Sequence, residues 1–148
     1  KKAKEISEYT GLPAISDDTG LEVDALDGRP GVYSARYAGA NATYADNVEK
    51  LLKEMEGVAE EERTARFRTV SVYYYEGQHF EAEGKVEGKI INKQLGTKGF
   101  GYDPVFYHEK KGKTFAQMSA DEKNMISHRG RAIQELYKIL KNKYIIKN

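Results

Sequence analysis

The strongest constraint on the fold is a run of strand-forming residues in the middle of the chain. Residues 65–75 are rich in β-branched and aromatic side chains, which favour strands: Phe67, Thr69, Val70, Val72, Tyr73, Tyr74 and Tyr75. Glu76-Gly77 follows at once and predicts a hairpin turn into a second strand over residues 78–91. Gly84 and Gly88 indicate bends or bulges in that strand. The fold is therefore expected to be built on a sheet.

Helix signals flank this hairpin. Thr43 is a natural N-cap for a helix over residues 44–55, whose apolar stripe is Tyr44, Val48, Leu51, Leu52 and Met55. Ser127 is a second N-cap, for a helix over residues 128–141 with the stripe Ile133, Leu136, Tyr137 and Leu140. One sheet with helices packed against it predicts an α/β fold.

The length predicts a single domain over residues 1–148. No repeat, linker or block of like charges divides the sequence. A chain of this length can bury about two-thirds of its unfolded surface. Eleven Tyr and five Phe supply bulky core side chains, so disorder is not expected.

Charge and composition exclude several classes of protein. The chain has 24 Lys and Arg against 23 Asp and Glu, so its net charge is +1. This charge provides no large positive field that could hold a nucleic acid or a membrane surface. The absence of Cys excludes disulfides, thiolate metal sites and a Cys nucleophile, and is compatible with a reducing compartment. No run approaches the roughly 18 apolar residues of a membrane helix. We therefore expect a soluble, cytoplasmic protein without nucleic-acid or membrane partners.

A pair of carboxylates follows a short apolar run. Residues 12–16 predict a buried strand, and Asp17-Asp18-Thr19-Gly20 predicts a polar turn at its end. Strand ends are where open sheets commonly bind ligands, and two carboxylates there could hold Mg²⁺ and position a water. The same residues also suit an Asx-turn that caps a strand.

A glycine-rich aromatic loop is the second candidate. Gly99-Phe100-Gly101-Tyr102-Asp103-Pro104 lets backbone approach a ligand while Phe100 or Tyr102 stacks on a planar ring. Asp103 adds an acceptor for ring N–H groups. A turn with an aromatic core anchor would explain this loop equally well.

The third candidate is Ser127-His128-Arg129-Gly130, at the start of the last predicted helix. Cations are disfavoured at a helix N-terminus, so an acceptor-rich partner is expected opposite His128 and Arg129. Lys123 could join them as a charge for phosphate. A solvated or Asp-paired surface cluster is the alternative. Taken together, the three segments carry the side chains that a nucleoside polyphosphate would need.

Four segments also follow the order and spacing of a known family. They are residues 15–26 (ISDDTGLEVDAL), 30–39 (PGVYSARYAG), 99–106 (GFGYDPVF), and Glu122-Lys123 with residues 126–130 (ISHRG). Over essentially the whole chain, these residues closely resemble the inosine triphosphate pyrophosphatase family, which removes noncanonical purine nucleotides such as ITP, dITP and XTP.

The resemblance implies a fold, a reaction and a site. The fold would be an elongated α/β fold of the Maf/Ham type, with a central mixed twisted sheet flanked by helices and two lobes enclosing an active-site cleft. The reaction would be Mg²⁺-dependent hydrolysis of a purine nucleoside triphosphate to monophosphate and pyrophosphate, usually by a homodimer. Asp18 matches the catalytic proton acceptor and a metal ligand, with Asp17 as a second metal ligand. The matching substrate-binding positions are Thr19, Phe100, Gly101, Tyr102, Asp103, Lys123, His128 and Arg129.

One departure from the family pattern leaves alternatives open. Family members begin with a strand and a Thr/Ser-Gly-Asn-x-x-Lys phosphate motif followed by a Glu metal ligand, whereas this sequence opens at Lys1-Lys2-Ala3. The expectation is a single domain that lacks its amino-terminal strand and phosphate motif. Besides an active enzyme, the chain could be an inactive nucleotide-binding fragment, or a structural domain whose three clusters are turns and caps.

Overall fold

The computed structural model describes residues 1–126 and 128–143. The α-helices are α1 (Lys2–Thr10), α2 (Tyr44–Glu54), α3 (Ala120–Ile126) and α4 (His128–Asn142). The strands are β1 (Ala14–Val23), β2 (Pro30–Gly31), β3 (Thr64–Tyr75), β4 (Gln78–Ile90), β5 (Phe106–His108) and β6 (Lys113–Thr114). Short 3₁₀ turns lie at Asp24–Leu26, Ser34–Arg36, Glu60–Glu62 and Phe115–Gln117. No helix in the described part of the chain is long and apolar enough to cross a membrane.

The strands form one sheet in the order β2-β1-β3-β4-β5-β6. The β1–β2, β4–β5 and β5–β6 pairs are antiparallel, where the family resemblance leads us to expect a mixed sheet. β2 pairs with β1 only at Leu21 and Glu22. No described strand therefore pairs with that edge of β1 over residues 14–19. The predicted hairpin and the α/β class are confirmed.

Contacts group the chain into two compact units, and the strands β1, β3 and β4 contribute to both. The first unit comprises Lys1–Thr19, Arg68–Lys85 and Ile126–Asn148, of which 127 and 144–148 lie outside the described residues. The second unit comprises Gly20–Phe67 and Val86–Met125. The N-cap expected at Ser127 falls outside the described residues, and the single domain over residues 1–148 stays a prediction.

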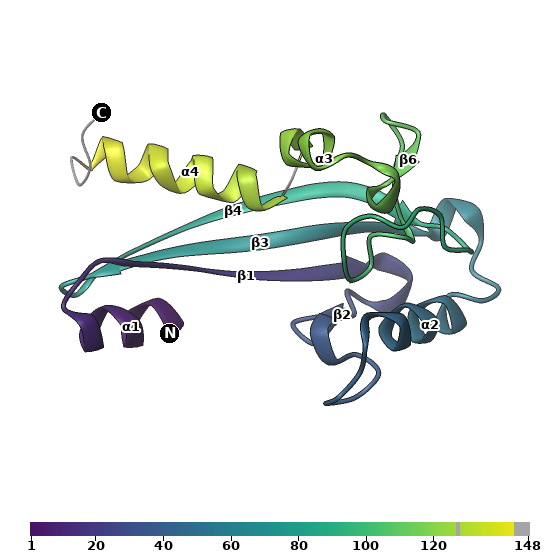
Figure 1. The fold of residues 1–148 in the computed structure, drawn as a ribbon, viewed down its shortest axis with the longest axis horizontal. Helices are drawn as coiled ribbons and strands as arrows, with labels where there is room; N and C mark the ends of the chain where they lie inside the picture. The colour runs from purple at the N-terminus through teal and green to yellow at the C-terminus, as the bar shows by residue number, and fades with distance from the viewer. Residues whose placement is uncertain (127, 144–148) are drawn as a thin grey trace. The chain divides into compact units, whose positions relative to one another are not determined.

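In the first unit, α1 and α4 lie on opposite faces of the strands (Figure 1). On the α1 side, the Tyr74 hydroxyl donates to Glu8 Oε1 at 3.2 Å. On the α4 side, an apolar cluster of Tyr73, Ala82, Leu136 and Leu140 is buried. The alternation of side chains along β3 thus gives each helix its own surface to pack on.

Glycine is required where α4 crosses β4. A Cβ at Gly84 would collide with the His128 carbonyl oxygen and the Ala132 backbone nitrogen, and would lie 2.9 Å from Arg131 Cβ. The helix backbone therefore rests directly on the strand at this point. A bend or bulge is predicted at Gly84, and the close approach of α4 is the physical reason for the glycine.

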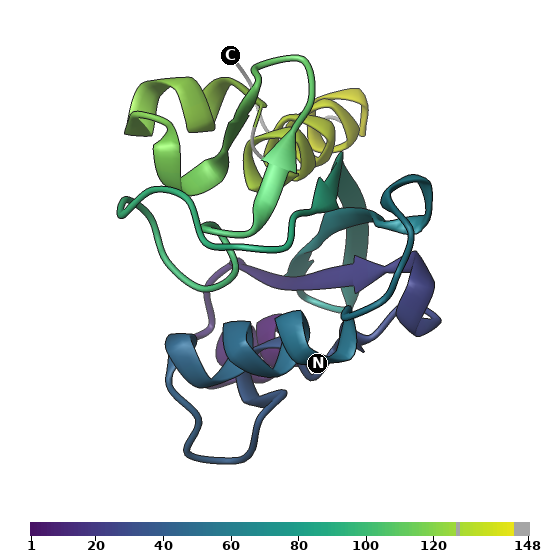
Figure 2. The same ribbon diagram turned by 90° about the vertical axis from the view of Figure 1, so that its right-hand side faces the viewer.

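Three phenylalanines pack together in the core of the second unit. The Phe67 and Phe106 ring centroids lie 4.5 Å apart, and Phe106 meets Phe115 edge to face at 4.9 Å. Near them, α3 lies beside the β5–β6 hairpin (Figure 2), and Lys113 Nζ pairs with Glu122 Oε2 at 3.0 Å.

A buried arginine connects the end of α2 to β4 in the second unit. Arg63 Nε donates to the Ile90 carbonyl at 2.7 Å, and its Nη1 donates to the carbonyls of Met55 and Val58. The Arg63 side chain thus ties Met55, the C-cap residue of α2, to Ile90, the last residue of β4.

The strand β1 corrects one prediction. The Asp17-Asp18-Thr19-Gly20 segment, predicted as a polar turn, lies in the middle of this ten-residue strand. Polar residues are tolerated there because alternate side chains of a strand face opposite ways, and one of the two faces is exposed. Gly20 also has a role in the sheet, since a Cβ there would lie 2.6 Å from the Gly31 carbonyl oxygen on β2.

The buried faces of two helices also differ from their predicted stripes. α4 buries His128, Ala132, Leu136 and Leu140, while Ile133 and Tyr137 are about half-exposed. α2 buries Asn47, Val48 and Leu51, and leaves Tyr44 exposed. The predictions counted large apolar residues, whereas the close contact of α4 with Gly84 favours a row that includes the small Ala132.

Candidate functional site

The predicted site residues fall into two groups, one in each compact unit. The first unit holds Asp17, Asp18, Thr19, His128 and Arg129. The second unit holds Phe100, Gly101, Tyr102, Asp103 and Lys123.

Asp17 and Asp18 point to opposite faces of β1. Asp17 Oδ2 lies 3.4 Å from Arg129 Nε on the α4 side. Asp18 Oδ1 lies 3.9 Å from Lys2 Nζ on the α1 side, and the Asp18 side chain is 95% exposed. The Lys2 ammonium also donates to the Asp17 carbonyl oxygen at 3.4 Å. The strand therefore separates the two carboxylates that the sequence places side by side.

Arg129 faces an acceptor-rich surface, as its position at a helix start predicts. Besides the Asp17 carboxylate, its Nε lies 3.3 Å from Thr19 Oγ1. The Thr19 hydroxyl in turn shares a 2.8 Å hydrogen bond with the hydroxyl of Thr69, a fully buried residue of β3. Thr69 fixes the Thr19 rotamer, and the sequence gives no signal for this beyond strand propensity. The Asp-paired alternative is thus the observed state of Arg129.

His128 is buried in the first turn of α4, so the solvated-surface alternative does not apply to it. It lies where the helix backbone rests on Gly84 of β4. The pair therefore has one buried imidazole and, beside it, one half-exposed guanidinium.

In the second group, the Asp103 carboxylate organises the glycine-rich loop. Asp103 is 3% exposed, and its Oδ2 accepts from the Phe100 backbone N–H at 3.0 Å and from Lys123 Nζ at 2.5 Å. A Cβ at Gly99, where φ is +76°, would collide with this same oxygen. Glycine is thus needed at this position for its backbone angle and for the room it leaves.

The two aromatic residues of the loop have different environments. Tyr102 is 5% exposed and donates its hydroxyl to the Ser34 carbonyl at 2.6 Å. Burial raises the pKa of Tyr102 well above its ordinary value. Phe100, by contrast, is 52% exposed. Tyr102 is thus the core anchor, and Phe100 is the ring available to a ligand. Gly101 between them has φ +60°.

The Lys123 side chain is largely buried, whereas a solvated phosphate-binding lysine would be exposed. Its ammonium bonds Asp103 and lies 4.5 Å from the centroid of the Phe100 ring and 5.6 Å from that of Phe115. A cation over an aromatic face and beside a buried carboxylate is held in one position. The loop and α3 are therefore joined through this side chain.

Asp18 is the residue of the first group that fits a magnesium ligand. Within residues 1–126 and 128–143, no three acidic or histidine side chains form a group that could hold a metal ion. Mg²⁺ commonly takes only one or two protein carboxylates, with substrate phosphates and water completing its shell. The exposed Asp18 carboxylate meets that requirement. Asp17 faces Arg129 on the other side of the strand, so it does not fit as a second ligand of the same ion.

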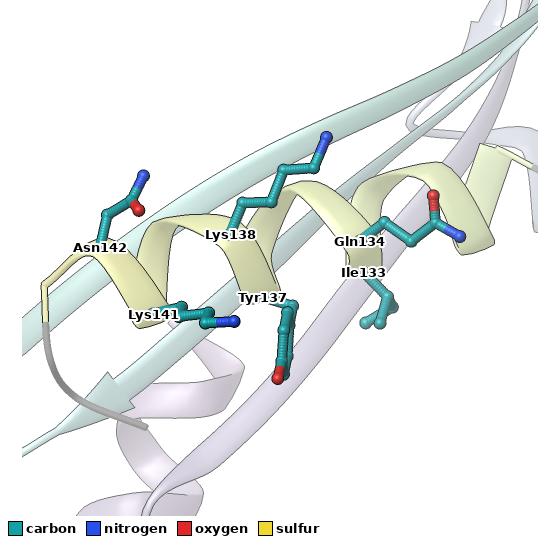
Figure 3. A pocket seen from close by; sticks show the side chains of 6 residues that line it. All are labelled: Ile133, Gln134, Tyr137, Lys138, Lys141 and Asn142. Atoms are coloured by element: carbon teal, nitrogen blue, oxygen red, sulfur yellow. The ribbon is translucent and has the colours of Figure 1, made fainter. Parts of the chain in front are cut away.

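A surface hollow of about 620 Å³ lies elsewhere. It is lined by residues of α4 alone: Ile133, Gln134, Tyr137, Lys138, Lys141 and Asn142 (Figure 3). Because one helix lines it, the hollow is an open flank of α4. None of the predicted site residues lines it.

Comparisons with known proteins agree with the sequence pattern. Residues 1–139 match the Ham1 family. A dITP/XTP pyrophosphatase of Geobacter sulfurreducens is 52% identical over 134 residues, covering 90% of this chain and 67% of the relative. A dITP/XTP pyrophosphatase of Idiomarina loihiensis is 50% identical over 138 residues, covering 91% and 68%.

Comparison with solved structures also points to the Ham1 family. The structure of the Staphylococcus aureus Ham1 protein matches with a TM-score of 0.90 and 40% identity, over 96% of this chain and 73% of that one. The sequence pattern, the relatives and the fold are those of one family. The chain belongs to the Ham1 family.

Proposed function

We propose that this chain hydrolyses noncanonical purine nucleoside triphosphates, dITP and XTP among them, to the nucleoside monophosphate and pyrophosphate. The observation that carries the proposal is about 50% identity, over nine-tenths of the chain, to proteins named dITP/XTP pyrophosphatase. The geometry of the two residue groups supports it, since one offers an exposed carboxylate beside cations and the other offers an exposed ring.

Hydrogen-bond donors of the protein distinguish the substrate purines from adenine. Hypoxanthine and xanthine carry an acceptor oxygen at C6, whereas adenine carries an amino donor. His128 and Arg129 supply donors that the C6 oxygen can accept, whereas the C6 amino group of adenine offers no acceptor. A site that pairs with the oxygen can therefore reject adenine by several kcal/mol, on the order of a 10⁴-fold preference.

The chemical step is assigned to Asp18. A water attacks the α-phosphorus, the bond to the bridging oxygen breaks, and pyrophosphate leaves. Asp18 orients the water and accepts its proton. Mg²⁺, for which Asp18 is the fitting ligand, would offset phosphate charge when bound. Lys123 offers a further positive charge to the substrate.

A direct assay tests the proposal. The purified chain is incubated with dITP, XTP, dATP or dGTP in the presence and absence of Mg²⁺, and pyrophosphate release is measured. The expected result is Mg²⁺-dependent release from dITP and XTP with at least about 10²-fold lower kcat/KM for dATP. A nucleotide-dependent rise in melting temperature without pyrophosphate release would favour the inactive nucleotide-binding reading.

The assembly and location of the protein belong to the same proposal. The homodimer follows from the resemblance to inosine triphosphate pyrophosphatases, and the cytoplasmic location from the absence of Cys in the sequence. Light scattering of the purified chain tests the dimer, and a mass of one chain would contradict it.

A further inference from the structure

An aromatic residue outside the predicted site lies beside Phe100. Tyr44, the first residue of α2, is 61% exposed, and its ring centroid lies 6.3 Å from that of Phe100 with the planes tilted by 41°. Both residues belong to the second unit. Two large aromatic side chains that remain exposed while touching each other form a ready surface for a planar ligand.

The start of α2 holds Tyr44 firmly in place. Thr43 Oγ1 accepts from the Asp46 N–H at 3.1 Å, and Asp46 Oδ2 accepts from the Thr43 N–H at 2.9 Å, which completes a capping box. The buried Asn47 accepts from the Ala38 N–H at 2.8 Å and donates to the Ala35 carbonyl at 3.1 Å. The backbone that carries Tyr44 is thus fixed on both sides, so little further entropy is lost when its ring meets a ligand.

Phe100 is held from a different direction. Its backbone N–H bonds Asp103, and the Lys123 ammonium lies 4.5 Å from the centroid of its ring. The backbone that carries each ring is therefore positioned before any ligand arrives. Preorganised aromatic surfaces of this kind bind with less ordering cost than mobile ones.

The ring geometry limits how a base can bind. A base sandwiched between two rings needs about 7 Å between parallel planes, since each stacked contact takes about 3.5 Å. Centroids 6.3 Å apart with a 41° tilt do not leave that slot. A base instead stacks on one ring and meets the other along its edge, as aromatic pairs commonly do.

We propose that Tyr44 is a base-contacting residue and that it forms with Phe100 an aromatic corner for the purine ring of the substrate. The assignment rests on the proposed function and extends its binding surface to α2. Because every purine has a π-face, the corner contributes affinity without distinguishing the C6 substituent. Tyr44 should therefore set how tightly purines bind, while discrimination among them lies elsewhere.

Kinetics of Tyr44→Ala test the proposal. Loss of one stacking partner is expected to raise KM for dITP and for XTP by the same factor, about 5- to 100-fold, with kcat changed less than about 2-fold. Tyr44→Phe keeps the ring and should behave as the unmodified chain. Tyr9→Ala, which removes an aromatic ring that is 93% exposed on α1, is the matched control and should leave KM unchanged.

Inhibition by inorganic tripolyphosphate separates base contacts from phosphate contacts. Its inhibition constant should be the same for Tyr44→Ala and the unmodified chain, because tripolyphosphate has no base. A parallel loss of dITP and tripolyphosphate affinity, or an unchanged KM for dITP, would overturn the assignment.

A fluorescence experiment keeps the inference separate from catalysis. The sequence has no Trp, so Tyr44→Trp introduces a single indole. Its emission should be quenched by dIMP and not by pyrophosphate. Quenching by dIMP in a chain that releases no pyrophosphate would contradict the proposed function and would still support the aromatic corner. Normal hydrolysis without quenching would contradict the corner alone.

Discussion

The Lys123 ammonium lies 2.5 Å from Oδ2 of Asp103, and Asp103 is almost fully buried. The lysine that resembles a phosphate-binding residue is thus already paired with the aspartate that resembles a base-binding one. Asp103 also accepts the Phe100 N–H. The pair therefore couples the stability of the loop to the charge offered to a substrate.

Breaking this pair should destabilise the protein. Lys123→Met removes the cation and leaves a buried carboxylate, so the free energy of unfolding should fall by about 3 kcal/mol. Lys123→Met combined with Asp103→Asn should recover part of that loss, because no unpaired charge remains. Urea unfolding of the two single variants and the double variant measures the coupling. Additive effects would show that the two side chains do not interact.

Asp18→Asn should abolish hydrolysis without affecting stability. The Asp18 side chain is 95% exposed and its 3.9 Å pair with Lys2 lies on the surface, so the denaturant midpoint should hardly move, while kcat for dITP should fall at least about 10²-fold if Asp18 is the base. Asp17→Asn is the matched control on the neighbouring residue. It weakens the Arg129 pair and should reduce kcat/KM less than Asp18→Asn does. Equal turnover in Asp18→Asn and the unmodified chain would remove Asp18 from the mechanism.

Phe100→Ala should weaken substrate binding more than it weakens the fold. Loss of stacking is expected to cost about 1–3 kcal/mol of binding free energy for dITP. Its half-exposed ring should contribute much less to stability than a buried phenylalanine, whose truncation costs about 3–5 kcal/mol. Phe106→Ala provides that comparison, since Phe106 is fully buried in the same unit. A stability loss at Phe100 as large as that at Phe106 would identify Phe100 as a core residue.

Gly84→Ala should displace the first turn of α4. The added Cβ would meet helix backbone, which cannot move aside as a flexible side chain can, so a loss of about 1–3 kcal/mol is expected. Because this turn carries His128 and Arg129, kcat/KM for dITP should fall as well. Hydrogen exchange should show faster exchange of α4 amides, with α2 amides as the internal control. Unchanged protection of α4 would mean that the helix and strand are less tightly packed than described.

A surface charge network should make stability depend on pH. Hydrogen bonds from Arg66 and Thr64 hold the pKa of Asp24 below its ordinary value of 3.8. A lowered folded-state pKa gives stability that is present above pH 3.8 and is lost as the pH falls through the folded-state pKa. Asp24→Asn should therefore cost up to about 1 kcal/mol at pH 7, and this difference should shrink as the pH falls through the folded-state pKa of Asp24. A difference that stays constant over an acid titration would exclude Asp24 as the titrating group.

Local signals account for the elements that the sequence predicts well. The capping box at Thr43 and Asp46 defines the start of α2, and the Glu76-Gly77 turn defines the hairpin of β3 and β4. Both depend on residues near one another in the chain, so a pattern in the sequence is enough to find them.

Contacts between distant residues account for what the sequence does not predict. Asp17 lies in a strand because β1 lies beside β3 in the sheet, and its carboxylate pairs with Arg129, more than a hundred residues away in the chain. The separate environments of Phe100 and Tyr102 depend on Ser34, Tyr44 and Lys123. The loop composition alone shows two aromatic residues, and only their partners distinguish the anchor from the exposed ring.

Successive side chains of β1 point to opposite faces of the strand. Asp17 and Asp18 are chemically the same, and a single backbone step decides which of them meets Arg129 and which meets solvent. A one-residue slip of β1 in the sheet would exchange the two carboxylates, and it would also move the fully buried Leu21 and Val23 to the opposite face. These apolar residues at the end of β1 are therefore as much a part of the site's specification as the aspartates themselves.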